Sequence, residues 1–181
     1  MFAILALLTF ASTVAVLGVA LVGRIAPGGT ATELAGDLRR SSLWLGWIVA
    51  LVTTLGSLYY SLVAHFEPCE LCWYQRICVY PLAVVLLVAA LRNDFGIWRY
   101  AAIPVVVGLG IAIYHSQLQA FPDQSTFCSA VNPCTIRYVW EFGFVSLPFM
   151  ALSAFSIIIV LMLVARANER EHEQADELAG A

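Results

Sequence analysis

Two cysteines, Cys69 and Cys72, stand three positions apart in the stretch PCELCWYQR at residues 68–76. Two thiols at this spacing can form and break a disulfide with little movement of the backbone. Pro68 favours a helix start, which would put Cys72 in the first turn, where the positive end of the helix dipole stabilises a thiolate. Arg76 follows one turn later on the same face and stays charged. We therefore predict a redox-active dithiol whose Cys72 thiolate is stabilised by Arg76.

A second pair, Cys128 and Cys134, encloses Asn132 and Pro133, which favour a turn. A disulfide across so short a loop is feasible and can exchange with an incoming thiol. Two dithiols on the same side of a small protein can pass a disulfide from one to the other. Two other interpretations stay open at this point. Each pair can be a static disulfide that staples its segment, or the four cysteines can bind zinc.

The segments that must position these residues are strongly apolar. Of the 181 residues, 61% are hydrophobic and 12% are charged. A soluble globule of this size cannot bury so much apolar surface, so we predict an all-α membrane protein whose outer face meets lipid. A bilayer span needs roughly 20 apolar residues. Five segments meet that length, at about residues 2–23, 43–64, 73–91, 100–118 and 142–165.

Arginines predict the orientation of the spans in the membrane. All nine cationic residues are arginines, and most fall at 24–42, 92–99 and after residue 165. Because cytoplasmic loops carry the excess of positive charge, we expect that side to be cytoplasmic. Both cysteine pairs and the N-terminus then lie outside, and the C-terminus lies in the cytoplasm. We expect residues 2–23 to be a retained span, because no positive residues precede them. No basic stripe indicates nucleic-acid binding.

Polar residues near the outer end of the fourth span form a further candidate site. His115 and Gln119 are four residues apart and therefore share a helical face. Ionisable groups in membrane segments are candidates for function, and both side chains can donate hydrogen bonds to the carbonyls of a quinone. The alternative is interfacial polarity without a ligand. Cys78, in an apolar run beyond Cys72, is interpreted as a buried packing residue.

Three longer stretches carry a family resemblance: PCELCWYQRI at 68–77, HSQLQAFP at 115–122 and NPCTIRYVWEFGFVSLPF at 132–149. With these the chain resembles the disulfide bond formation protein B (DsbB) family, in particular its short BdbC-like branch. The resemblance covers about residues 43–165 and implies a four-helix transmembrane redox domain there. The extra N-terminal transmembrane helix and a cytoplasmic loop would occupy residues 1–42, and an acidic cytoplasmic tail residues 166–181.

The resemblance also implies a reaction. Members of this family are thiol:quinone oxidoreductases that reoxidise an extracytoplasmic thioredoxin-fold thiol oxidase, of the DsbA or BdbD kind, and pass the electrons to a membrane quinone. This supports disulfide formation in exported proteins. The quinone is menaquinone or ubiquinone, and the Gram-positive character of the branch favours menaquinone.

Residue roles follow from the same resemblance. The partner's thiolate would attack Cys128, and Cys134 would exchange with Cys69. Cys72 would lie beside the quinone ring with Arg76 as its stabilising charge, and His115 and Gln119 match positions near the quinone. We assign no metal ligand. The alternatives are an enzyme similar to the vitamin K epoxide reductases, or a non-catalytic membrane scaffold that bears zinc or structural disulfides.

Overall fold

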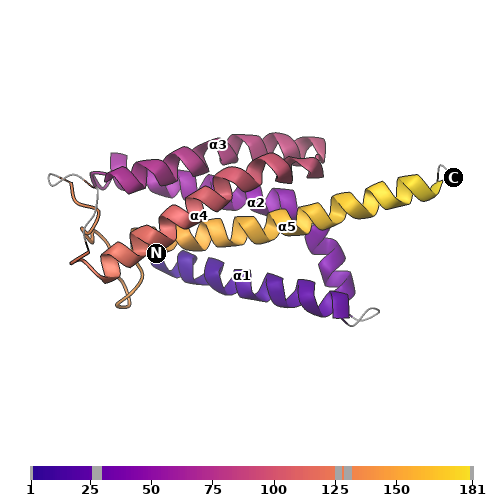
Figure 1. The fold of residues 1–181 in the computed structure, drawn as a ribbon, viewed down its shortest axis with the longest axis horizontal. Coiled ribbons are helices and arrows are strands. Elements are labelled where there is room, and N and C mark those ends of the chain that lie inside the picture. The colour runs from indigo at the N-terminus through magenta and orange to yellow at the C-terminus, as the bar shows by residue number, and fades with distance from the viewer. Residues whose placement is uncertain (1, 26–29, 125–127, 129–131, 180–181) are drawn as a thin grey trace.

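The computed structural model describes residues 2–25, 30–124, 128 and 132–179. Over these residues the chain is almost entirely helical, with one isolated bridge between Glu141 and Val145. The elements, in chain order, are α1 (Phe2–Ile25), α2 (Thr30–Leu62), α3 (Glu70–Arg92), the short 3-10 helix η1 (Phe95–Ile97), α4 (Trp98–Ala120) and α5 (Leu147–Ala179) (Figure 1).

Four of the helices close into a ring. α2 packs on α3, α3 on α4, α4 on α5, and α5 returns to α2, whereas α1 lies outside this ring against α2 and α5 (Figure 1). The core between them is apolar and includes Leu82, Val105, Phe155 and Ile158. At Gly108 a Cβ would stand 2.3 Å from the ring of Phe155, so glycine permits the close contact of α4 with α5.

All five helices are long and apolar enough to cross a bilayer. Large apolar side chains also cover the outside of the bundle, as expected of a surface that meets lipid. The predicted fold class, a four-helix transmembrane bundle with one additional N-terminal helix, is therefore confirmed. The chain is a multi-pass membrane protein.

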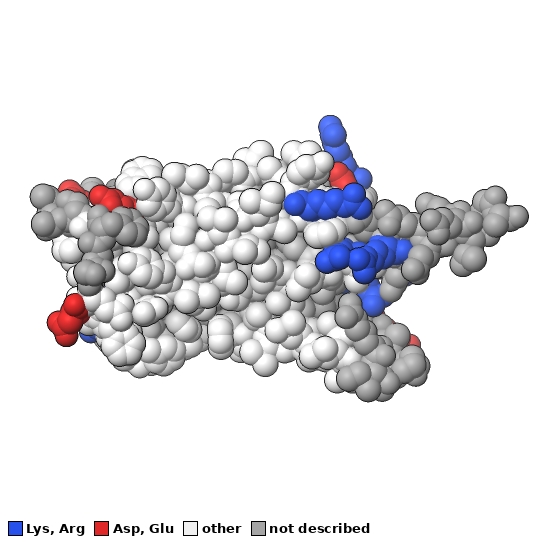
Figure 2. Space-filling model, in the orientation of Figure 1, with Lys and Arg blue, Asp and Glu red and all other residues white. Residues whose placement is uncertain are grey.

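The two ends of the bundle differ in charge. Most of the basic side chains drawn in blue gather at one end, and several acidic side chains lie at the other (Figure 2). Arg92 ends α3 and Arg99 lies in the first turn of α4, at the basic end. The dithiol at the start of α3 and the loop after α4 lie at the opposite end, so both cysteine pairs share one end of the bundle.

Two expected boundaries are wrong. We expected a loop over residues 24–42, but α2 begins at Thr30, and Glu33 complements the helix dipole in its first turn. We also expected the last span to begin near residue 142. Residues 141–145 instead form a tight reversal, with Glu141 paired to Val145, and α5 begins at Leu147. At its other end α5 continues through the tail to Ala179.

Candidate active site

The first cysteine pair opens α3, as the sequence predicts. Cys69 is the N-cap in an extended conformation, and its carbonyl accepts the first helical hydrogen bond from Trp73 N at 3.1 Å. Cys72 therefore lies in the first turn. The two thiols are not bonded to each other, and their sulfur atoms are 3.1 Å apart. A small movement of the two sulfurs would close the disulfide, so the pair is arranged for redox chemistry.

The second pair forms a disulfide, which joins Cys128 to Cys134. Its loop is tied to the first pair, because the Asn132 side chain donates a hydrogen bond to the Pro68 carbonyl at 3.2 Å. Cys134 is buried in the same apolar cluster as Cys69. The disulfide uses both loop sulfurs, so a zinc site of four thiolates is not available in this state.

His115 and Gln119 of α4 both point to the loop that carries the disulfide. The Nε2 atom of His115 lies 3.0 Å from the Cys134 carbonyl and 3.7 Å from the Cys69 sulfur. Gln119 donates from its side-chain Nε2 to the Ile136 carbonyl at 2.7 Å, and the main-chain carbonyl of Gln119 accepts from Arg137 Nε at 3.0 Å. His115 therefore connects the two cysteine pairs, and Gln119 holds the loop in place.

The reduced dithiol favours a thiolate on Cys69. The hydrogen bond from the Cys72 thiol is the main reason that the pKa of Cys69 is lowered to about 4. Burial acts in the opposite direction, and the neighbouring His115 adds to the lowering. The sequence predicted the thiolate on Cys72. That prediction did not include the Cys72–Cys69 hydrogen bond or the contact of Cys69 with His115.

Three side chains at this site could hold a metal ion. The sulfur atoms of Cys69 and Cys72 and a ring nitrogen of His115 all lie within 4.8 Å of one another. Two thiolates and an imidazole are ligands that suit zinc. The set is complete only while the dithiol is reduced, so metal binding would compete with disulfide formation.

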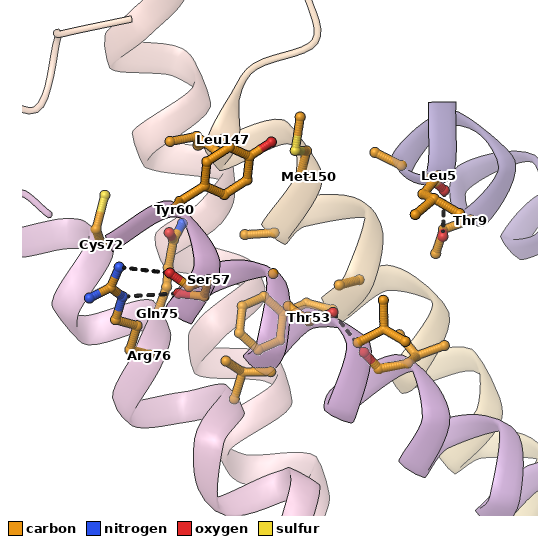
Figure 3. Close-up of a pocket in the computed structure, with 18 of the residues that line it drawn as sticks. Leu5, Thr9, Thr53, Ser57, Tyr60, Cys72, Gln75, Arg76, Leu147 and Met150 are labelled. Atoms are coloured by element: carbon orange, nitrogen blue, oxygen red, sulfur yellow. Dashed lines mark hydrogen bonds between the residues drawn. The ribbon is translucent and has the colours of Figure 1, made fainter. Parts of the chain in front are cut away.

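A larger cavity opens on the other side of Cys72, with a volume of about 340 Å³. This volume is within the range of about 300–1,000 Å³ that small-molecule sites occupy. Most of its wall is apolar and comes from α1, α2 and α5, whereas α3 contributes Cys72, Gln75 and Arg76 (Figure 3). Polar groups therefore meet the cavity from α3 and also from α2, which contributes the hydroxyls of Ser57 and Tyr60.

Arg76 is fixed in this wall by α2. Its Nε donates to the Ser57 hydroxyl at 3.0 Å, and Nη2 donates to the Ser57 carbonyl at 3.3 Å (Figure 3). Nη2 also donates to the Ser61 hydroxyl. The guanidinium also lies over the ring of Trp73, at 5.3 Å from the centroid. These contacts hold a permanent positive charge beside the cavity at the level of Cys72.

Gln75 lines the large cavity but was not predicted from the sequence to belong to a site. Its side chain is only 7% exposed, and its Nε2 has no hydrogen-bond partner among the described residues. A buried donor without a partner is costly, and a ligand that accepts from it would remove that cost. The signal was present, since a glutamine inside a membrane span is itself unusual.

His115 and Gln119 do not line the large cavity. They line a separate space of about 40 Å³, together with Cys69, Cys72 and Arg76. Of the five residues just named, Cys72 and Arg76 also line the large cavity, and the other three do not. The structure thus places the two α4 residues on the disulfide side of the dithiol, and their predicted contact with a quinone stays a prediction. Cys78 is buried in the helical core, as predicted.

Comparisons with known proteins identify the family to which this chain is similar. The family model for the disulfide bond formation protein DsbB matches residues 39–165. A probable disulfide formation protein of Coxiella burnetii (strain CbuK_Q154) is 42% identical over 131 residues, which are 71% of this chain and 89% of the relative. Disulfide bond formation protein C of Bacillus subtilis (strain 168) is 40% identical over 131 residues, 71% of this chain and 95% of the relative. No solved structure matches.

Proposed function

Because the chain belongs to the DsbB family of disulfide bond formation proteins, we propose that it is a membrane thiol:quinone oxidoreductase. It reoxidises an extracytoplasmic thioredoxin-fold thiol oxidase of the DsbA or BdbD kind and passes the electrons to a membrane quinone, menaquinone or ubiquinone. The net reaction converts the partner's dithiol and a quinone into the partner's disulfide and a quinol. This reaction supports disulfide formation in exported proteins.

One observation carries this proposal: the dithiol lies between a disulfide and a cavity. Cys69 shares a buried cluster with Cys134, whereas Cys72 also lines the 340 Å³ cavity. A thiol pair in this position can receive electrons by exchange on one side and release them on the other.

The residues around the cavity fit a quinone. A quinone is a flat apolar ring with two carbonyl acceptors, and here a largely apolar cavity carries donors on α3. The unpartnered Nε2 of Gln75 is free to donate to one carbonyl, and Arg76 places a positive charge where negative charge develops as electrons arrive. When bound, the quinone supplies a two-electron acceptor beside Cys72.

The electron path begins at the loop, with both cysteine pairs oxidised. The partner's thiolate attacks Cys128, forming a mixed disulfide and releasing Cys134 as a thiolate. Cys134 attacks Cys69 of the Cys69–Cys72 disulfide, and Cys72 leaves as a thiolate. The partner's second thiolate then resolves the mixed disulfide, so the partner departs oxidised and Cys128 is released.

The second half of the path restores the protein. Cys128 attacks Cys134, which re-forms the loop disulfide and releases Cys69. The protein then has a loop disulfide and a free dithiol, which is the state of this structure. Cys69 and Cys72 finally close into a disulfide and give two electrons and two protons to the quinone.

This path gives both thiolates a role. While Cys69 is bonded to Cys134 it has no thiol, so the negative charge belongs to Cys72 alone, beside Arg76. Once Cys69 is released, the hydrogen bond from Cys72 and the contact with His115 stabilise its thiolate. His115 also donates to the Cys134 carbonyl, which keeps the two exchanging cysteines together.

The arginine distribution supports the proposed orientation. Arg92, Arg99 and Arg166 lie at the end of the bundle opposite the dithiol, and Arg99 and Arg166 both contact the ring of Trp98. If this end faces the cytoplasm, in accordance with the positive-inside rule, both cysteine pairs face the extracytoplasmic partner.

The other two functions are less well supported. The DsbB match over residues 39–165 favours this family over the vitamin K epoxide reductases. A zinc-bearing scaffold would have to use Cys69, Cys72 and His115 without the loop cysteines. Metal analysis of the reduced protein separates this function from redox turnover.

The proposal is tested by quinone reduction with the purified full-length protein. A reduced thioredoxin-fold oxidase is added as electron donor, and the quinone absorbance is followed with short-chain ubiquinone and menaquinone. We expect turnover in the wild type and in Cys78→Ala, and none in Cys72→Ser. Equal turnover in Cys72→Ser would contradict the proposal, and so would its absence in the wild type with both quinones.

A further inference from the structure

The helix α1 lies outside the part of the chain that the family model matches, which begins at residue 39. It packs on α2 and α5 through a stripe of small buried residues that includes Ala3, Ala6 and Thr13. The opposite side carries exposed large apolar residues such as Leu8 and Val14, which suit contact with lipid. The helix therefore has one inner side, and that side follows the seam between α2 and α5.

The inner side of α1 also forms part of the large cavity. Leu5, Ala6 and Thr9 line it, and Figure 3 shows Leu5 and Thr9 across the cavity from Cys72 and Arg76. The Thr9 hydroxyl donates to the Leu5 carbonyl at 2.7 Å within α1. Its hydrogen-bonding capacity as a donor is thus used inside the helix, and the wall that α1 presents is essentially apolar.

We propose that α1 is the fourth wall of the quinone site, an inference that rests on the function proposed above. The polar edge of the quinone faces α3, where Gln75 and Arg76 supply the donor and the positive charge. Its apolar edge faces Ala6 and Thr9, and α1 separates the ring from the surrounding lipid along the seam of α2 with α5. The added helix thereby retains the quinone beside Cys72.

Small side chains on α1 are what this arrangement requires. Ala6 is buried at the cavity wall, so a larger residue there must extend into the space that the ring would occupy. Ala11 gives a matched control, because it is exposed on the same helix and does not line the cavity. The two alanines allow the same substitution to be made toward the cavity and toward lipid.

The first test compares Ala6→Phe with Ala11→Phe in the full-length protein. We expect Ala6→Phe to raise the KM for a short-chain quinone by roughly tenfold or more, because the phenyl ring competes for the cavity. Both variants should oxidise the reduced partner in a single turnover at the wild-type rate, since that step uses the loop. If Ala6→Phe and Ala11→Phe have the same KM as the wild type, α1 is not part of the site.

A second test needs no substitution and therefore does not depend on a variant that folds. The wild-type protein is irradiated with a photoreactive short-chain azidoquinone, and the labelled residues are identified by mass spectrometry. We expect label on α1 within residues 5–9, in addition to α3, and protection of both by excess unmodified quinone. Protected label on α3 with none on α1 would overturn the inference and leave the proposed function standing. Absence of protected label and of quinone turnover would instead contradict the proposed function.

Discussion

The dithiol of Cys69 and Cys72 has two sides that differ in size and in chemistry. On the loop side it meets a space of about 40 Å³ in which His115 and Gln119 bond to backbone carbonyls of the disulfide loop. On the membrane side Cys72 meets a cavity of about 340 Å³ with mostly apolar walls. The loop side is tied together by hydrogen bonds, whereas the membrane side leaves room for a ligand.

This difference indicates that the two halves of the proposed reaction can be separated. Thiol exchange needs sulfur atoms held at fixed positions, and the loop side supplies that through Asn132, His115 and Gln119. Electron transfer to a diffusible acceptor needs an accessible pocket with a fixed charge, and the membrane side supplies that through Arg76. A substitution on one side should therefore impair one half-reaction and spare the other.

The largest effect should come from Cys128→Ser. Removal of this sulfur leaves the partner's thiolate without the loop disulfide that it attacks, so turnover driven by the reduced partner should fall below detection. The Cys69–Cys72 pair remains, and dithiothreitol should still drive quinone reduction through it. Quinone absorbance measured with each donor checks this, and loss of both activities would show that the two sides are not separable.

Arg76→Met should give the next largest effect, on the membrane side. Loss of a charged hydrogen-bonding group costs about 1.5–3 kcal/mol, or roughly 10–100-fold in the kcat/KM for quinone. Oxidation of the partner in a single turnover should be reduced much less than quinone reduction. Arg137→Met is the matched control, because Arg137 donates a hydrogen bond to the main-chain carbonyl of Gln119 on the loop side. The control should slow partner oxidation and spare the KM for quinone; the reverse pattern would invert the assignment of the two sides.

A smaller effect is expected in the pH dependence of the alkylation rate of Cys69. Because its pKa is lowered to about 4, its thiolate should persist as the pH falls from 8 to 5, where an ordinary thiol with a pKa near 8.5 loses about tenfold in alkylation rate per pH unit. Iodoacetamide labelling of the reduced protein, resolved by residue in the mass spectrometer, measures this profile. His115→Ala should move the midpoint of the profile to higher pH. An ordinary thiol profile in the wild type would contradict the Cys69 assignment.

The smallest effect should come from Gln75→Leu. A single neutral hydrogen bond contributes about 0.5–1.5 kcal/mol, so the KM for quinone should rise roughly two- to tenfold with kcat nearly unchanged. Gln117→Leu changes the same residue type at an exposed position of α4 and should leave quinone kinetics as they are. Identical KM values in both variants would remove Gln75 from the site.

The sequence predicted the number of helices and the position of the dithiol, since span length and the proline before Cys69 depend on local chemistry alone. It did not predict which face of each helix points into the bundle. Because α3 and α4 each meet both lipid and the core, apolar residues surround them, and their sequence pattern does not reveal an inner face. For this reason Gln75 was missed, and so was the separation of His115 from the larger cavity. Tertiary packing determines both the burial of Gln75 at the cavity and the position of His115 outside it.

The order in which the two disulfides form shows which cysteine pair the quinone oxidises. The wild-type protein is fully reduced, mixed with excess quinone, quenched at successive times with an alkylating agent and analysed by mass spectrometry. If the dithiol is the site that meets the quinone, the Cys69–Cys72 disulfide should appear first, and the Cys128–Cys134 disulfide should follow from it and be absent in Cys72→Ser. A Cys128–Cys134 disulfide that forms first, or forms at the wild-type rate in Cys72→Ser, would contradict the account.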